Sequence, residues 1–419
     1  MSTKHSIDDN SSKKSAIESE AREQMESAKI NTVKFTLLDG TLMEVKYSLP
    51  IKRKQHQEEQ NENKPLLVFL HGSFHSAWCW TNNFFSYFTS HGYPCVALSL
   101  RGTNGTFAGE GVNKVKVDAH VEDVLHFLER VSCIDSNDNG ERDGSSISDF
   151  MSEIHGNYAS KIPPVLIAHS FGGLTAMKLL EHPKLKEHVR QSLRLQEKVG
   201  VSTQTVKTSN ISVTRLLSTM ALLCSVPPSG IKKMSFRSLR KNPKQGWRIM
   251  KGLAMKKAVT DPKLCRLLFF DQENIPCDAV NDPVTKNEGI ASEETLQEYM
   301  AHFSKDSKVT MDLSDMAKKL PIYATDDDGK SIHLKQNVLQ FPALVLGGTD
   351  DYIVDRDAVE ETARFFGVED GANTVLVDNA VHDVMLGSCW NTVAEKVEVW
   401  LDEIASIALI SKPPSNLAQ

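Results

Sequence analysis

Three residues far apart in the sequence have the types that nucleophilic catalysis requires. They are Ser170, Asp351 and His382, and each follows a largely apolar run, namely Val165–His169, Leu344–Gly348 and Thr374–Val377. A serine hydroxyl is a weak nucleophile unless a base removes its proton, and that base needs an acid to orient it. We therefore interpret Ser170 as a candidate nucleophile, His382 as its base and Asp351 as the orienting acid.

The sequence around Ser170 predicts a tight turn between a strand and a helix. The branched residues of Val165–His169 follow two prolines and predict a buried strand, and Leu174–Glu181 predicts the start of a helix. A serine at such a turn is held out of the sheet, with its hydroxyl near the positive end of the helix. The two backbones pass close together there, and the small residues at this place are Ala168, Gly172 and Gly173.

Apolar runs that alternate with helical patterns predict a parallel sheet with right-handed crossovers. Further strands are expected within 66–70, 95–100 and 214–226, and helices within 84–88, 117–131 and 393–407. Two alternating segments flank Asp39-Gly40 and predict a hairpin at the antiparallel edge of the sheet. We expect an α/β fold with a mostly parallel central sheet of about eight strands, with the three candidate residues at its C-terminal edge.

The turn Ala168-His169-Ser170-Phe171-Gly172 resembles the nucleophile elbow of the α/β-hydrolase fold superfamily, written G-x-S-x-G, with Ala168 in place of the first glycine. The resemblance is to serine hydrolases with a helical cap, of the AB hydrolase-1 type. It implies the chain order serine, acid, histidine, which this sequence follows. In the family's acid loop an Asp precedes a Val by three residues, which favours Asp351 over Asp350. The alternative for Asp350 is a turn or capping carboxylate.

Two further segments carry the resemblance. Val377–Leu386 is similar to the family's histidine loop, with Val381 at a position that is often glycine. His71-Gly72-Ser73 is similar to the family's His-Gly-X turn. This implies that the backbone N–H groups of Ser73 and Phe171 stabilise an oxyanion, and that His71 is a structural anchor of the turn.

The segment His71–Trp80 also resembles the matching segment of plant methylesterases and hydroxynitrile lyases. On this basis Phe74 and Trp78 are candidates for the substrate pocket, together with His169 beside the nucleophile. Aromatic residues in such a segment also pack in the core, and that alternative stays open.

The pattern divides the chain into four parts. Residues 1–30 are polar and are expected to be disordered, and 31–228 form the first part of the core, with polar insertions near 132–160 and 183–212. Residues 229–340 carry helical patterns without a clear strand and are expected to form a helical cap or lid. Residues 341–410 form the second part of the core.

The cap begins with an unusual charge pattern. Residues 231–260 contain ten Lys or Arg residues and no Asp or Glu, and Met, Phe, Trp and Leu lie between the basic residues. A basic amphipathic helix can contact an anionic membrane or receive an anionic substrate. The alternative is a cap whose apolar side packs on the core while its basic side faces solvent or the acidic body of the protein.

Composition sets further limits. The formal net charge of -6 over 419 residues gives no sign of general nucleic-acid binding, and no apolar run is long enough to span a bilayer. The N-terminal stretch lacks the apolar block of a signal peptide, so we expect a cytoplasmic protein, with organelle import left open. The seven scattered cysteines favour reduced thiols rather than a metal site. We expect no metal and no cofactor, and the sequence leaves the oligomeric state open.

The leading hypothesis is a serine hydrolase that cleaves a carboxylic ester of a small molecule through an acyl-enzyme. The ester could be an acyl or a methyl ester, including a lipid-like one. The resemblance leaves two alternatives: the same site acting on a thioester, C–C or peptide bond or transferring an acyl group, and a non-catalytic small-molecule receptor on a hydrolase scaffold. Family members with a carboxylate nucleophile are disfavoured because the elbow holds a serine.

Overall fold

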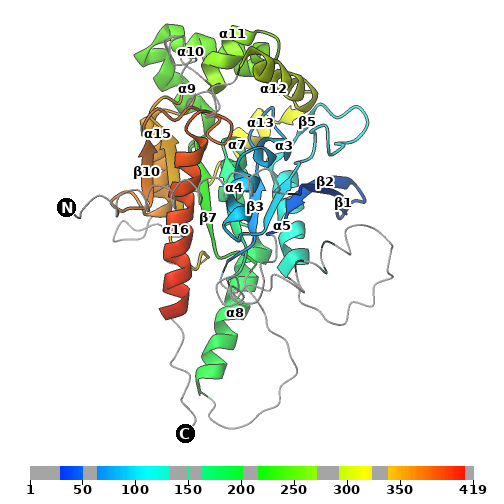
Figure 1. The fold of residues 1–419 in the computed structure, drawn as a ribbon, viewed down its shortest axis with the longest axis vertical. Helices are drawn as coiled ribbons and strands as arrows, with labels where there is room; N and C mark the ends of the chain where they lie inside the picture. Colours follow the sequence, from blue (N-terminus) through cyan, green and yellow to red (C-terminus); the bar gives the residue numbers. More distant parts are fainter. Residues whose placement is uncertain are drawn as a thin grey trace, which may run out of the picture.

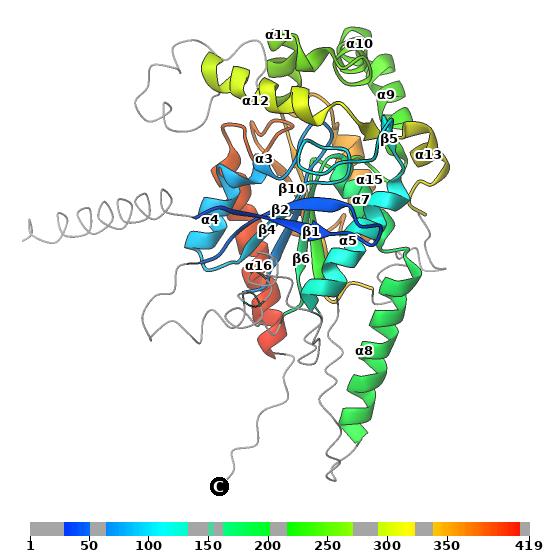
Figure 2. The same cartoon turned by 90° about the vertical axis from the view of Figure 1, so that its right-hand side faces the viewer.

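The computed structural model describes residues 29–50, 64–132, 150, 152, 154, 162–201, 216–270, 292–322 and 338–410. Most of the segment expected to be disordered, and most of the polar insertion expected near 132–160, lie outside these residues. The description below is limited to these ranges (Figures 1 and 2).

A single sheet of eight strands organises the fold, in the order β1-β2-β4-β3-β6-β7-β9-β10. The strands are β1 (Asn31–Thr36), β2 (Leu42–Ser48), β3 (Leu67–Leu70), β4 (Cys95–Leu98), β6 (Val165–His169), β7 (Thr219–Leu223), β9 (Leu344–Gly348) and β10 (Thr374–Val377). The pairs β1–β2 and β2–β4 are antiparallel, and all other pairs are parallel. The expected mostly parallel sheet with an antiparallel hairpin at its edge is thus confirmed.

The register of the parallel strands brings the ends of β3, β6, β7 and β9 to one edge. Leu70 pairs with Ala168, Ala168 with Leu222, and Leu222 with Val345. The segments that follow these strands therefore begin side by side. They include the turn at Ser170 and the loop that contains Asp351.

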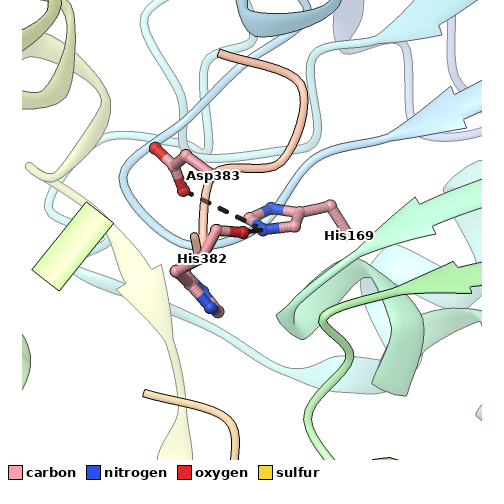
Figure 3. A group of neighbouring side chains, drawn as sticks. All are labelled: His169, His382 and Asp383. Atoms are coloured by element: carbon pink, nitrogen blue, oxygen red, sulfur yellow. Dashed lines mark hydrogen bonds and ion pairs between the residues drawn. The ribbon is translucent and has the colours of Figure 1, made fainter. Parts of the chain in front are cut away.

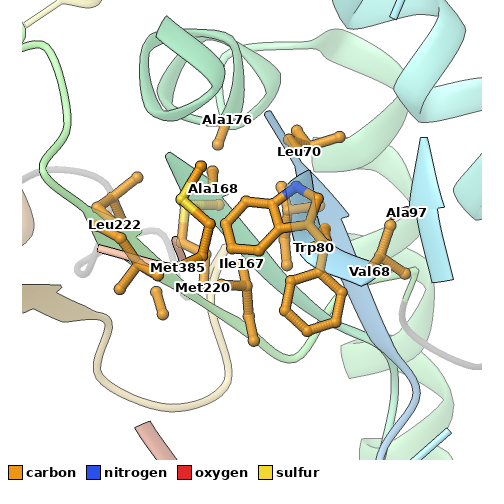
Figure 4. Packing of buried hydrophobic residues seen from close by; sticks show 14 of the residues in the cluster. Val68, Leu70, Trp80, Ala97, Ile167, Ala168, Ala176, Met220, Leu222 and Met385 are labelled. Carbon is orange, nitrogen blue, oxygen red and sulfur yellow. The ribbon is translucent and has the colours of Figure 1, made fainter. Parts of the chain in front are cut away.

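Helices cover both faces of the sheet, with α3, α4 and α16 on one face and α5, α7 and α15 on the other (Figure 2). Their bounds are α3 (Trp78–Thr81), α4 (Phe84–Ser90), α5 (Val117–Ser132), α7 (Phe171–Leu179), α15 (Arg356–Phe366) and α16 (Trp390–Ile410). Trp80 and Met385 pack among strand residues such as Ile167 and Met220, all fully buried (Figure 4). Burial of each large apolar side chain contributes about 1.5–3 kcal/mol, so this core fixes the strand ends firmly.

The described residues between β7 and β9 form a mainly helical layer above the sheet (Figure 1). Its elements are α9 (Gly230–Lys241), α10 (Pro243–Ile249), η1 (Met250–Ala254), η2 (Lys257–Val259), α11 (Pro262–Cys265), η3 (Arg266–Phe270), α12 (Glu293–Asp306), β8 (Thr310–Met311) and α13 (Leu313–Lys318). This is the segment in which we expected a cap without strands. It does contain one, because β8 pairs with β5 (Lys114–Val115) from the core.

Two other features complete the description. Residues Pro183–Val201, within the second expected polar insertion, form the long helix α8, whereas 202–212 lie outside the described residues. The five cysteines of the described part form no disulfide with one another, and four of them are buried. Within the same ranges, no helix combines the length and the apolar character that crossing a membrane requires.

Candidate active site

Ser170 occupies a strained turn between β6 and α7. Its φ is 52° and its ψ is -118°, a conformation that costs a non-glycine residue about 1–3 kcal/mol. Two backbone hydrogen bonds hold it there: the Ser170 N–H donates to the Leu223 carbonyl at 3.1 Å, and the Ser170 carbonyl accepts from the Val226 N–H at 3.1 Å. The turn therefore presents the hydroxyl above the edge of the sheet rather than within it.

The glycine of the elbow is required by close backbone approach. A Cβ at Gly172 would lie 2.6 Å from the carbonyl oxygen of His71 and 2.8 Å from that of Leu70. Both are backbone atoms at the end of β3, so they cannot move aside as a flexible side chain could. The start of α7 thus packs directly against the end of the neighbouring strand.

The structure brings Ser170, His382 and Asp351 together. His382 Nε2 lies 3.2 Å from Ser170 Oγ, and His382 Nδ1 lies 2.9 Å from Asp351 Oδ2. A carboxylate only accepts hydrogen bonds, so Nδ1 carries the proton and donates it, which leaves Nε2 free to accept from the serine hydroxyl. Asp350 makes no such contact with His382 among the interactions of the described residues.

The Asp351 carboxylate is itself held in place. Its Oδ1 accepts hydrogen bonds from the backbone N–H groups of Ile353 at 2.8 Å and Val354 at 2.9 Å. Its side chain is completely buried beside His382. The residue three positions after the acid therefore has a direct role, because its N–H orients the carboxylate.

The environment of His382 raises its pKa. Burial alone would lower the pKa, but the negative charge of Asp351, its hydrogen bond to Nδ1 and the charge of Asp383 together outweigh burial. The result lies above the ordinary value of 6.5. A raised pKa makes the imidazole a stronger base and stabilises the imidazolium that forms when it takes a proton.

Two backbone N–H groups beside Ser170 are available to an oxyanion. Neither Phe171 N–H, at the first position of α7, nor Ser73 N–H donates a hydrogen bond to any residue that the structure describes. Both residues line the same cavity as Ser170 and His382. This arrangement suits a pair of donors for a developing negative charge.

His71 fixes the orientation of the Ser73 N–H. Its Nδ1 donates to the carbonyl of Gly72 at 2.7 Å, and its Nε2 accepts from the Leu100 N–H at 2.9 Å. The carbonyl and N–H of a trans peptide point in opposite directions, so this bond turns the Ser73 N–H away from His71. Burial lowers the pKa of His71 to about 4, so the ring stays neutral. A neutral ring can donate from Nδ1 and accept at Nε2 at the same time.

A cavity of about 220 Å³ opens beside the serine, and most of its lining is apolar. Phe74 lies in its wall, and the cap contributes much of the rest, including Ile231, Met234, Leu239, Ile249, Met250 and Leu253. The cavity connects the reacting centre with the helices of the cap.

Two residues expected in the pocket lie elsewhere, and their placement corrects that interpretation. Trp78 donates its indole N–H to Asp306 at 2.9 Å and stacks on His302, so it packs against α12. His169 is fully buried behind the nucleophile, and its Nε2 donates to the backbone carbonyl of His382 at 2.9 Å (Figure 3). Burial holds the pKa of His169 well below its usual value, so this ring is a neutral support of the histidine loop.

Sequence reasoning missed two residues of the site, His75 and Asp383. His75 Nε2 lies 2.8 Å from Asp383 Oδ2, and His75 Nδ1 lies 2.8 Å from the carbonyl oxygen of Ser73. Their positions in the sequence could have indicated a role near the site. His75 lies two residues after Ser73, and Asp383 directly follows His382. Periodicity gave no reason to pair them.

Two groups of possible metal ligands occur among the described residues, and both include His382. The groups are His169, His382 and Asp383, and Cys224, Asp351 and His382. Both ring nitrogens of His382 already have hydrogen-bond partners in Asp351 and Ser170. A metal at either place would displace those bonds, so we assign no metal to these groups.

Comparison with known proteins was made for the whole chain. A model described as the alpha/beta hydrolase family matches residues 67–395, whereas the search of curated proteins found no match. A laboratory-evolved variant of potato epoxide hydrolase is 15% identical, with a TM-score of 0.49, over 90% of this chain and 100% of that chain. A naproxen esterase from Bacillus subtilis is 15% identical, with a TM-score of 0.47, over 91% of this chain and 96% of that chain. Likenesses at this level carry no argument about substrate.

The packing at Gly172 makes a first prediction. We expect Gly172→Ala to lower the free energy of unfolding by about 1–3 kcal/mol, because the new methyl group forces the end of β3 away from α7. The same shift separates the N–H groups of Phe171 and Ser73, so labelling of Ser170 by a fluorophosphonate should slow. Chemical denaturation and labelling rates measure the two effects.

Gly371→Ala is the matched control, because a Cβ there would meet nothing closer than 3.9 Å. It should leave stability and labelling unchanged. A Gly172→Ala protein with the stability and labelling rate of the unmodified chain would contradict the tight packing described for the elbow.

Proposed function

The chain belongs to the alpha/beta hydrolase family, and from this premise we propose that it is a serine hydrolase that cleaves a carboxylic ester. One observation carries the proposal. Ser170 Oγ, both ring nitrogens of His382 and the Asp351 carboxylate form a connected series of hydrogen bonds of 3.2 Å and 2.9 Å. The series ends at a cavity that Ser73 and Phe171, the residues of the proposed oxyanion donors, also line.

The first half of the reaction forms an acyl-enzyme. Ser170 Oγ attacks the ester carbonyl carbon while His382 Nε2 takes the hydroxyl proton, and Asp351 stabilises the imidazolium. The carbonyl oxygen becomes an oxyanion that accepts from the N–H groups of Ser73 and Phe171. Each such donor contributes about 10²–10³-fold to the rate. The intermediate collapses when His382 gives the proton to the leaving alcohol oxygen.

The second half restores the enzyme. A water molecule attacks the acyl carbon while His382 Nε2 takes its proton, and the same two N–H groups hold the second oxyanion. Collapse releases the carboxylic acid and returns the proton to Ser170 Oγ. The proposed steps use side chains and backbone groups of this chain alone.

The lining of the cavity supports an ester with an apolar portion. The cavity of about 220 Å³ is walled by aliphatic, Met and Phe side chains on the side away from Ser170. An apolar acyl chain or alcohol placed there loses contact with water, which stabilises the complex by about 0.8 kcal/mol for each buried CH₂. We therefore propose a lipid-like acyl ester rather than a strongly polar one.

The proposed nucleophile is tested by turnover of p-nitrophenyl esters from acetate to palmitate. The unmodified protein should hydrolyse esters with acyl chains longer than acetate fastest. Ser170→Ala should lose essentially all of the rate, because among the described residues Ser170 carries the hydroxyl that is hydrogen-bonded to His382 Nε2. A fluorophosphonate should label the unmodified protein and not Ser170→Ala. Folded protein that neither turns over any ester nor reacts with the probe would contradict the proposal and favour the receptor alternative.

The raised pKa of His382 predicts the direction of the pH dependence. The base works only when unprotonated, so the rate should be low in acid and rise through an inflection above 6.5. In Asp351→Asn the main charge that raises the pKa is gone, so the inflection should move to lower pH. The rate should also fall on the order of 10⁴-fold, because the carboxylate no longer fixes the tautomer.

Labelling rates measured across pH for both proteins provide this test. Asp350→Asn is the matched control, because Asp350 is not bonded to His382, and its profile should coincide with that of the unmodified protein. Equal effects of the two substitutions would show that Asp351 is not the orienting acid.

A further inference from the structure

The outer part of the cap exposes an unusual number of large apolar side chains. Phe236 is 68% exposed, Trp247 54% and Met255 55%, and Leu239 and Met250 are exposed to a lesser degree. All lie on α9, α10 and η1 or directly after them. We call the exposed residues of 230–257 the cap face. Single exposed apolar residues are common, but a cluster of this kind marks a place of contact.

The cap face is continuous with the mouth of the cavity. Leu239 and Met250 are exposed to solvent and also line the cavity beside Ser170. Leu239 packs against Gly246, where an added Cβ would lie 2.7 Å from its Cδ2, so α9 and α10 lie side by side. A molecule on this face therefore has an apolar path of side chains toward the serine.

Two groups stand out among the basic residues of the cap. Arg237 and Lys241 face α15, where they pair with Asp355 at 2.6 Å and Asp357 at 2.8 Å, as expected for contact with an acidic body. A second group has no ion pair with any residue of the described ranges. Its members are Lys232, Lys233, Arg240, Lys244, Lys251 and Lys257.

We propose that the cap face docks on an anionic phospholipid bilayer and takes its ester substrate from it. Charge complementarity argues for this occupant, since the chain carries a net charge of -6 whereas residues 231–260 contain no acid. Trp and Phe side chains prefer the interface of a bilayer, and Lys and Arg attract its anionic headgroups. The proposal that substrate arrives by this route rests on the proposed esterase function, but the docking itself does not.

Docking is tested by flotation of the full chain with phosphatidylcholine vesicles that either contain or lack phosphatidylserine. We expect binding to the anionic vesicles only, with loss on addition of salt. Replacement of Lys232, Lys233 and Lys244 by Gln should weaken binding on the order of tenfold to a hundredfold. Trp247→Ala should weaken it about tenfold.

Two substitutions on the exposed side of α16 are matched controls, Lys396→Gln and Val399→Ala, and should bind as the unmodified chain does. Ser170→Ala should bind equally well, which separates docking from catalysis. Equal binding to neutral vesicles, no binding at all, or binding that survives the cap substitutions would overturn the proposal. Self-association that the cap substitutions abolish would also overturn it and assign the face to a second copy of the chain.

Delivery of the ester from the bilayer to Ser170 is measured separately from docking. For an ester embedded in anionic vesicles, the cap substitutions should raise KM several-fold, whereas for a short soluble ester both KM and kcat should stay unchanged. A protein that binds vesicles yet hydrolyses no ester would retain the docking surface and contradict only the proposed function.

A second inference concerns the buried pair of His75 and Asp383, whose side chains are 1% and 0% exposed. A carbonyl oxygen only accepts, so His75 Nδ1 carries a proton and donates it to Ser73. The ring packs against Phe303 at 4.7 Å and stacks on Trp78 at 5.9 Å, which fixes its plane. The pair therefore spans from the turn of Ser73 to the residue after His382.

We infer that His75 and Asp383 are positioning residues for the proposed ester hydrolysis. The histidine loop is already fixed on two other sides, because His169 donates to the His382 carbonyl and the Asp383 N–H donates to Phe269 at 3.0 Å. The His75–Asp383 bond adds the link to the oxyanion turn. It thereby sets the separation between the base and the Ser73 N–H.

The test compares two substitutions on a short soluble ester. Asp383→Ala should lower kcat on the order of tenfold to a hundredfold with little change in KM. The reason is that the Ser73 N–H moves relative to His382, whereas the residues that line the pocket stay in place. Asp383→Asn keeps the shape and a hydrogen bond to the ring, so it should recover most of kcat. Tyr93→Phe removes a hydrogen bond to Asp402 far from the site. It should lower the free energy of unfolding and leave kcat unchanged.

A kcat for folded Asp383→Ala equal to that of the unmodified protein would overturn this role. A loss that Asp383→Asn fails to recover would do the same. Labelling of Ser170 in the unmodified protein is measured first, so that failure of the proposed function is recognised separately.

Discussion

The close approach of the start of α7 to the end of β3 is the constraint on which the site depends. Gly172 lies against the carbonyl oxygens of His71 and Leu70, so the backbone that carries Phe171 and the turn that carries Ser73 are held in direct contact. The strained φ of Ser170 is tolerated because Leu223, the last residue of β7, and Val226, shortly after it, form hydrogen bonds with its backbone. The register of the sheet thus fixes the positions of the proposed nucleophile and of its oxyanion donors relative to each other.

Four buried histidines at this edge differ in role because their partners differ. Burial outweighs the nearby carboxylates and keeps the rings of His71 and His169 neutral, and each fixes one backbone peptide of the site. His382 is equally buried, but the adjacent Asp351 raises its pKa, so it alone has the properties of a base. His75 faces Asp383 and joins two loops. The same side chain therefore serves as anchor, support or base according to its electrostatic surroundings.

The strands and the three central residues could be predicted because their signals are local. Apolar runs located β3, β6, β9 and β10, and the order of Ser170, Asp351 and His382 followed from what comes after each run. The roles of Trp78 and His169 could not, since they depend on α12 and on a loop more than two hundred residues away. The pair of His75 and Asp383 is separated by 308 positions, and two-residue strands such as β5 and β8 have no periodicity.

The cap is fastened to the core at the acid loop itself. Arg237 of α9 forms two hydrogen bonds with Asp355, and Gln245 of α10 donates to the carbonyl of Tyr352 at 3.0 Å. Tyr352 and Asp355 enclose the two residues whose N–H groups hold the Asp351 carboxylate. Four of the basic residues without an ion pair in the described ranges, Lys232, Lys233, Arg240 and Lys244, lie on the same two helices. The helices that carry much of the cap face are therefore anchored to the loop that contains Asp351.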